Sequence, residues 1–175
     1  MIANKNIPYY LIAIGLFVLL KFSYTIADSN DLTFLLSPTN KIVGLLTGSK
    51  SVFIQDSGYF HQQLNILIDK SCSGFNFWLL CFLMLTFLTL KYFNNKGGKF
   101  YAMTFSFIGA YVLTILVNSS RIFTSIIIQN PSITLTKHPI VHESVGIITN
   151  LTFLILIYLI VEKTLIKRNT NAKFA

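Results

Sequence analysis

Four apolar stretches constrain this chain most, because each is about as long as a helix that crosses ~30 Å of hydrocarbon. They cover residues 7–27, 75–93, 100–118 and 145–161. Only 11% of the side chains are charged, less than half of the ~25% typical of a soluble domain. The sequence therefore predicts an all-α integral membrane protein, with about four transmembrane helices in a single polytopic domain over residues 1–175.

Positive charge is distributed unevenly among the segments that connect these stretches. Eight basic residues fall on the predicted side that holds both termini, whereas the other side has five basic and five acidic residues. The positive-inside rule thus predicts cytoplasmic termini in a plasma or inner membrane, with 162–175 as a cytoplasmic tail. Residues 28–73 and 119–144 become extracytoplasmic loops. Because the basic residues form no single stripe, we expect the bilayer as a partner and no nucleic acid.

The loop 28–73 is long for a connection, and long loops are usually functional. Residues 32–46 are expected to form a short helix at the membrane interface. Short apolar runs on both sides of Asp56-Ser57-Gly58, continuing to Ile68, predict a small extracytoplasmic hairpin. This hairpin would lead directly to Cys72.

A short polar segment, Ser71-Cys72-Ser73-Gly74, opens the second apolar stretch. Helix N-termini carry unpaired N–H groups and partial positive charge, which favour a thiolate over a thiol. Cys72 is therefore a candidate nucleophile, and Gly74 permits a close backbone approach. The alternative is that Ser71 or Ser73 caps the helix and Cys72 has no chemical role. Cys81 lies nine residues further into the apolar stretch, where we expect an inert thiol.

Asn118 and Arg121 end the third apolar stretch. Their spacing of three residues places them on one helical face. An arginine at this position often reaches the lipid phosphates at the interface. Here, however, the apolar pattern continues from Ile122 to Ile128, which favours an Arg121 that lies below the membrane surface and faces protein.

His142 opens the fourth apolar stretch from the same predicted side of the membrane. Histidine is the side chain best able to accept a proton near neutral pH, which a cysteine nucleophile requires. Glu143 either orients this histidine or only favours the positive end of the helix. His61 and His138 are expected to be solvated loop histidines.

Cys72, Arg121 and His142 thus fall at one predicted membrane level on three different helices. Antiparallel packing of these helices would bring together a thiolate, a base and a group that stabilises negative charge. This set predicts acyl transfer at a peptide bond on the outer face. No metal or other cofactor is expected, since the chain has only two cysteines and no His-Glu-x-x-His motif.

Three short motifs, in this order, resemble the signatures of the exosortase/archaeosortase family: Cys72-Ser73-Gly74, Asn118-Ser119-Ser120-Arg121 and His142-Glu143-Ser144-Val145-Gly146. The resemblance covers roughly residues 52–161. With about four spans, the chain is similar to the short subgroup called exosortase K, whereas many relatives have about twice as many spans.

The resemblance implies a multi-pass membrane cysteine transpeptidase. Its substrates would be membrane-anchored proteins with a C-terminal sorting signal, made of a short motif, a hydrophobic span and a basic tail. Cys72 would be the nucleophile that forms a thioester, His142 the proton-transfer partner and Arg121 the stabilising group. Asn118 fits the motif, and Ser73 and Gly74 would support the site. The resemblance does not define the substrate motif, the acceptor or the oligomeric state.

A different class of protein explains part of the pattern. In a non-enzymatic membrane adaptor or small transporter, Arg121 and His142 would line a polar cavity, but Cys72 would then have no role. A membrane phosphatase is disfavoured, because no histidine follows Arg121 until His138.

Overall fold

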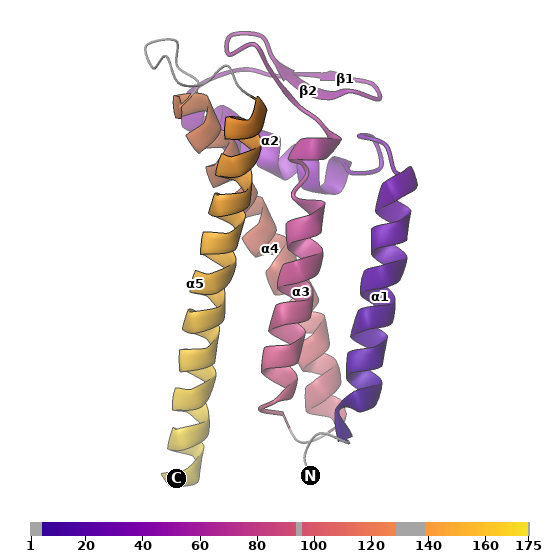
Figure 1. Cartoon of the computed structure of the whole chain (residues 1–175), viewed down its shortest axis with the longest axis vertical. Helices are drawn as coiled ribbons and strands as arrows, with labels where there is room; N and C mark the ends of the chain where they lie inside the picture. The colour runs from indigo at the N-terminus through magenta and orange to yellow at the C-terminus, as the bar shows by residue number, and fades with distance from the viewer. Residues whose placement is uncertain (1–4, 94–95, 129–138, 175) are drawn as a thin grey trace. The chain divides into compact units, whose positions relative to one another are not determined.

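The computed structural model describes residues 5–93, 96–128 and 139–174. Five α-helices and three short strands account for most of these residues (Figure 1). In chain order, the elements are α1 (Ile7–Ile26), α2 (Thr33–Thr47), β1 (Val52–Ile54), β2 (Gly58–His61), β3 (Ile66–Ile68), the 3-10 turn η2 (Lys70–Cys72), α3 (Phe75–Leu90), α4 (Lys96–Ile128) and α5 (Pro139–Phe174).

The described part of the chain has four helical segments that are long and apolar enough to cross a membrane: Ile7–Ile26, Lys70–Leu90, Gly97–Ile128 and Gly146–Lys167. Many of their large apolar side chains point outward, such as Phe22 at 69% exposure. A bilayer is a favourable solvent for such side chains, whereas water is an unfavourable one. The predicted all-α multi-pass membrane fold with a small strand element is therefore confirmed.

The chain divides into two compact units. Unit 1 contains residues 1–25, 76–113 and 153–175, and unit 2 contains residues 26–75 and 114–152. Helices α4 and α5 contribute residues to both units.

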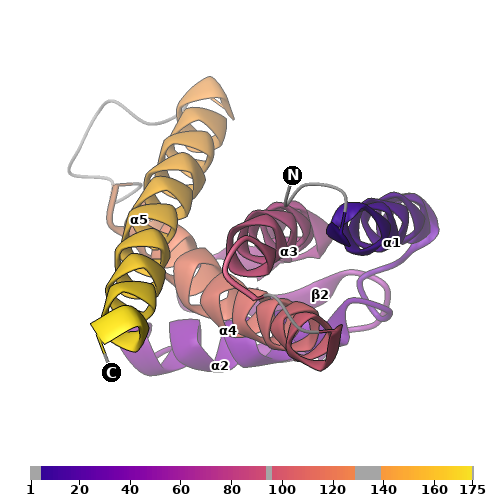
Figure 2. The ribbon, with the colours of Figure 1, turned by 90° about the horizontal axis from the view of Figure 1, so that it is seen from below.

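In unit 1, aromatic pairs join α3 to α1 and to α4, which lie on either side of it (Figure 2). The Trp78 ring lies 4.7 Å from that of Phe107 of α4, and its indole N–H donates to the Phe107 carbonyl at 3.2 Å. On the other side, Tyr10 of α1 stacks on Phe87 at 4.6 Å. Such pairs add to the stabilisation from apolar burial alone.

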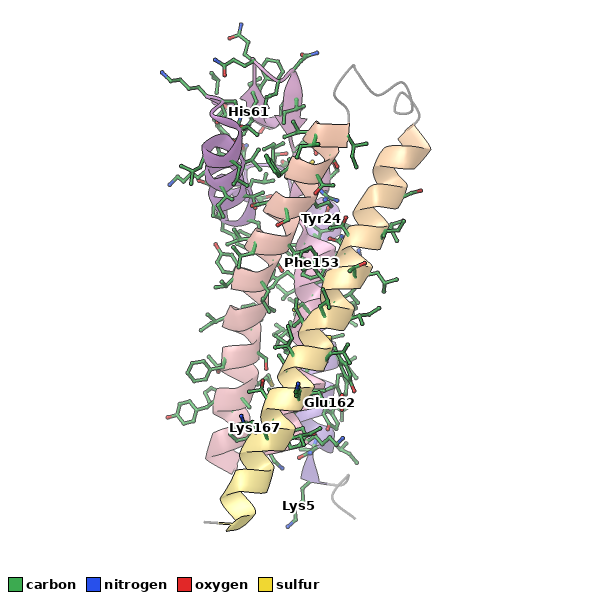
Figure 3. All side chains as sticks on the ribbon, turned by 90° about the vertical axis from the view of Figure 1, so that its left-hand side faces the viewer. Lys5, Tyr24, His61, Phe153, Glu162 and Lys167 are labelled. Carbon is green, nitrogen blue, oxygen red and sulfur yellow. The ribbon has the colours of Figure 1, made fainter. Side chains whose placement is uncertain are left out.

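Lysines gather at one end of unit 1. Lys5 and Lys167 both lie toward this end (Figure 3). Lys99 is 4% exposed, and its ammonium donates to the Lys5 carbonyl at 3.4 Å.

Unit 2 contains α2 and a three-stranded antiparallel sheet in the order β1-β2-β3. The predicted short helix and hairpin are both present, and the hairpin continues into a third strand. Gly58 permits the turn between β1 and β2, because its φ of +119° disfavours any other residue. A methyl group on Gly58 would also lie 2.3 Å from the Ile68 carbonyl oxygen.

His61 of β2 is fully buried against α2, so the expectation of a solvated loop histidine is wrong. Its Nε2 lies 2.7 Å from Asn40 Oδ1 and its Nδ1 lies 2.7 Å from Ser49 Oγ. Because an amide oxygen only accepts, Nε2 carries the proton and Nδ1 of the neutral ring accepts from Ser49. Burial lowers the pKa of His61 from its ordinary value. His138 lies outside the described residues.

Two helices extend into the segment 119–144, which the sequence predicted as a loop. Helix α4 continues to Ile128, so Asn118 and Arg121 lie inside this helix rather than at its end. Helix α5 begins at Pro139, and proline suits the first helical position because its fixed φ matches a helix. Residues 129–138 lie outside the part that the structure describes.

Candidate active site

The candidate nucleophile lies in the turn η2, which Asp69 fixes in place. The Asp69 carboxylate accepts from the Ser71 N–H at 2.9 Å and from the Ser71 hydroxyl at 2.6 Å. Its backbone carbonyl accepts from the Cys72 N–H at 2.9 Å. Cys72 is half-buried, and its sulfur lies 3.8 Å from Ser71 Oγ. The thiol is therefore held by a short, well-bonded turn directly before α3.

Ser73 forms a hydrogen bond to the first residue of α3. Its hydroxyl oxygen accepts from the Phe75 N–H at 3.3 Å, and the side chain is 1% exposed. This bond satisfies one of the unpaired donors at the start of the helix. Cys72 therefore directly precedes a buried residue that is bonded to the start of α3.

Gly74 provides the close approach that the sequence predicted. Its φ is +70°, and a methyl group there would lie 3.0 Å from Asn118 Cγ and 3.1 Å from Thr114 Cγ2. A side chain at this position would thus be strained, and the Asn118 and Thr114 side chains of α4 would have to move by a few tenths of an ångström. Glycine therefore lets the Cys72 turn lie against α4.

Asn118 of α4 bonds directly to the Cys72 turn. Its side-chain amide donates to the Cys72 carbonyl oxygen. Asn118 is 2% exposed, and its Oδ1 is buried without a hydrogen-bond partner among the described residues. Its role in this geometry is to position the backbone of the nucleophile.

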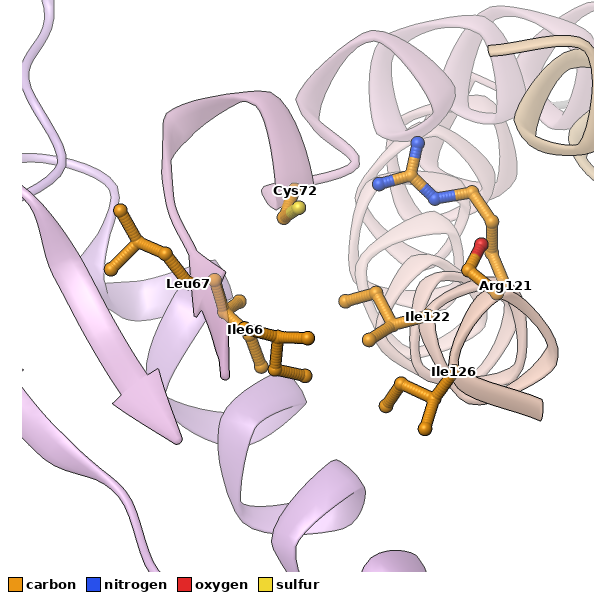
Figure 4. A pocket seen from close by; sticks show the side chains of 8 residues that line it. Ile66, Leu67, Cys72, Arg121, Ile122 and Ile126 are labelled. Carbon is orange, nitrogen blue, oxygen red and sulfur yellow. The ribbon is translucent and has the colours of Figure 1, made fainter. Parts of the chain in front are cut away.

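Cys72 and Arg121 line the same cavity of about 60 Å³ (Figure 4). The guanidinium extends from α4 toward the side of the cavity on which Cys72 lies. The remaining walls are mainly apolar and come from β3 and α4: Ile66, Leu67, Ile68, Ile122, Ser125 and Ile126. The structure thus brings two of the three predicted catalytic side chains to one small, mostly apolar site.

The third motif approaches this site through Gly146 of α5. A methyl group on Gly146 would lie 3.4 Å from Arg121 Nη1 and 3.5 Å from Arg121 Cδ. His142 lies in the first turn of α5, four residues before Gly146. The side chains of His142 and Glu143 lie outside the part of the chain that the structure describes.

Cys81 is fully buried in α3, and neither cysteine forms a disulfide. The sequence reasoning missed Asp69, which holds the Cys72 turn. A signal for it exists, since Asp-x-Ser is a spacing at which an aspartate bonds the backbone N–H two residues later. Thr114, one helical turn before Asn118, was also missed, because only tertiary packing brings it to Gly74.

Within the described ranges, no three His, Cys, Asp or Glu side chains gather in a way that would hold a metal ion. The side chains that the structure brings together at the site are the Cys72 thiol, the Arg121 guanidinium and the Asn118 carboxamide. No protein-family model matches the chain, and no curated protein or solved structure is significantly similar to it. Fold and site together define a multi-pass membrane protein with a thiol and guanidinium pocket.

Proposed function

We propose that this protein is a membrane cysteine transpeptidase of the exosortase kind. It cleaves C-terminal sorting signals of exported, membrane-anchored proteins on the extracytoplasmic face and transfers them to an acceptor. The observation that carries the proposal is that Cys72 and Arg121, from two separate motifs, line one cavity. Both termini are placed in the cytoplasm on the basis of the charge bias.

The proposed reaction begins when His142 takes the proton of the Cys72 thiol. The thiolate attacks the scissile carbonyl carbon, and the negative charge that develops on the carbonyl oxygen is stabilised by Arg121. His142 then returns the proton to the leaving amine, the C–N bond breaks and a thioester to Cys72 remains. An acceptor nucleophile attacks this thioester, gives up its proton to His142 and releases the Cys72 sulfur.

The position of His142 rests on helical spacing. Gly146 packs on Arg121, and residues four apart are neighbours on one face of a helix. His142 would therefore share the face of α5 that meets Arg121. Ser73, Gly74 and Asn118 support the site by fixing the turn that presents the thiol.

The test is co-expression with a candidate protein that ends in a hydrophobic span and a basic tail. We expect the candidate to be shortened by the wild type and to keep its full size with Cys72→Ala. Cys81→Ala is the matched control, because it removes a thiol that lies outside the site. Unchanged processing in Cys72→Ala, at equal protein level, would contradict the proposal.

The competing function is a non-enzymatic adaptor or small transporter, in which Arg121 and His142 line a polar cavity. Such a protein would tolerate Cys72→Ser, because the smaller hydroxyl fits the space of the thiol. A transpeptidase would lose its processing activity in the same variant, since serine is a much weaker nucleophile without its own activation. Cys72→Ser thus separates the two functions.

A further inference from the structure

In the part of the chain that the structure describes, one edge of the strand β3 is covered by no other strand. The sheet order is β1-β2-β3, and β3 pairs with β2 alone. Among the described residues, no further backbone hydrogen bond reaches Ile66–Ile68 from its other side. Unpaired strand edges are templates for the addition of another extended chain.

The backbone groups that face this open edge follow from the register. The Ile68 carbonyl points toward β2, since a methyl group on Gly58 would lie 2.3 Å from its oxygen. Tyr59 pairs with Ile68, and hydrogen-bonded residues alternate along an antiparallel strand. The N–H and C=O of Leu67 therefore point away from β2. The backbone of Asp69 is still extended, with φ −110° and ψ −168°.

This open edge borders the cavity that holds the candidate nucleophile. All three residues of β3 line the cavity together with Cys72, which follows Ile68 by four residues. Ile66 points into the cavity, whereas Leu67 points away from it (Figure 4). Ile122 and Ile126 of α4 form the facing wall.

We propose that the open edge of β3 binds the recognition segment of the substrate as an added β-strand, which leads its scissile bond to Cys72. The inference rests on the proposed function and names the conformation in which the substrate is recognised. The Leu67 N–H and C=O bind the peptide backbone. The cavity of about 60 Å³ accepts one small apolar side chain of the added strand, because most of the side chains that line it are aliphatic.

The occupant is an extended peptide rather than a helix or a lipid. A strand edge offers alternating donors and acceptors, which only another extended backbone matches. An acyl chain would leave the Leu67 N–H and C=O unpaired, and unpaired buried polar groups are costly.

The opposite edge of the sheet supplies a matched control. By the same alternation, the N–H and C=O of Phe53 point away from β2, since Phe53 pairs with Tyr59. No residue of β1 lines the Cys72 cavity. Proline removes an N–H and is tolerated on edge strands when that N–H points outward.

Leu67→Pro and Phe53→Pro therefore test the two edges in the full chain. With the co-expressed candidate protein, we expect Leu67→Pro to slow processing by about tenfold, which corresponds to the loss of one hydrogen bond and the added bulk of the ring. Phe53→Pro is expected to stay within about twofold of the wild type. Wild-type processing by Leu67→Pro at equal protein level would overturn the inference.

A second measurement is independent of cleavage and of the folding of the proline variant. A photo-reactive p-benzoylphenylalanine is placed at position 67 or 53 in Cys72→Ala, and cross-linking to the candidate protein is compared. We expect a cross-link from position 67 and none from position 53. Equal cross-linking from both positions, or none from 67, would overturn the inference. A cross-link from 67 without Cys72-dependent cleavage would instead refute the proposed function and leave the binding edge in place.

Discussion

Gly74→Ala should damage both the stability of unit 2 and the presentation of the Cys72 thiol. Its φ of +70° costs an alanine about 1–2 kcal/mol. The new methyl group would also lie 3.0 Å from Asn118 Cγ and 3.1 Å from Thr114 Cγ2, and such overpacking costs about 1–3 kcal/mol. We therefore expect a total destabilisation of about 2–5 kcal/mol.

Gly48 offers the matched control, because it has nearly the same backbone conformation without the collision. Its φ is +68°, and a methyl group there would meet nothing within 4 Å. Gly48→Ala should thus cost only the conformational part, about 1–2 kcal/mol. The difference between the two variants isolates the contact between the Cys72 turn and α4.

The assay is unfolding of the detergent-solubilised protein, together with the maleimide labelling rate of Cys72 in a Cys81→Ala background. Gly74→Ala should change the labelling rate, whereas Gly48→Ala should not. In the double variant Gly74→Ala with Asn118→Ala, part of the clash is removed, so its cost should be less than the sum of the single costs. Equal destabilisation by Gly74→Ala and Gly48→Ala would refute the reasoning.

Three further predictions follow from the site and the sheet. An impermeant thiol reagent added from outside should label half-buried Cys72 well before fully buried Cys81; faster labelling of Cys81 would contradict the proposed topology. Arg121→Lys should impair processing, because an ammonium does not replace a fork of donors; full activity would leave Arg121 only a point-charge role. The free energy of unfolding should fall as the pH drops below ~6.5, because burial lowers the pKa of His61 and the unfolded chain therefore binds the proton first. Unfolding is measured at pH ~7.5 and ~5.5, and His61→Gln should remove the difference between the two values.

The local pattern was sufficient to predict the helices and the hairpin. Four apolar runs of the right length can satisfy their backbone groups in lipid only as helices. The Asp56-Ser57-Gly58 turn predicted the hairpin, because few residues adopt its backbone conformation. The spacing of Asn118 and Arg121 predicted that both lie on one face of α4. In the structure, Asn118 donates to the Cys72 carbonyl, and Arg121 lines the same cavity as Cys72.

Burial and long-range contacts could not be predicted in the same way. Nothing in the sequence around His61 shows that α2 covers it, because Asn40 and Ser49 reach it only after the chain folds back. The extent of α4 beyond Arg121 was also underestimated, since residues 119–121 are polar and a hydropathy window ends there.

The sequence by itself determined that this protein is a multi-pass membrane protein, and it singled out Cys72, Arg121 and His142 as candidate catalytic residues. Those properties depend on composition and short-range spacing, which a linear pattern contains. Only the tertiary structure decided that Cys72 and Arg121 share a cavity and that the open edge of β3 borders it. These contacts join residues about 50 positions apart in the chain, and they exist because Gly74 and Asn118 let the Cys72 turn dock on α4.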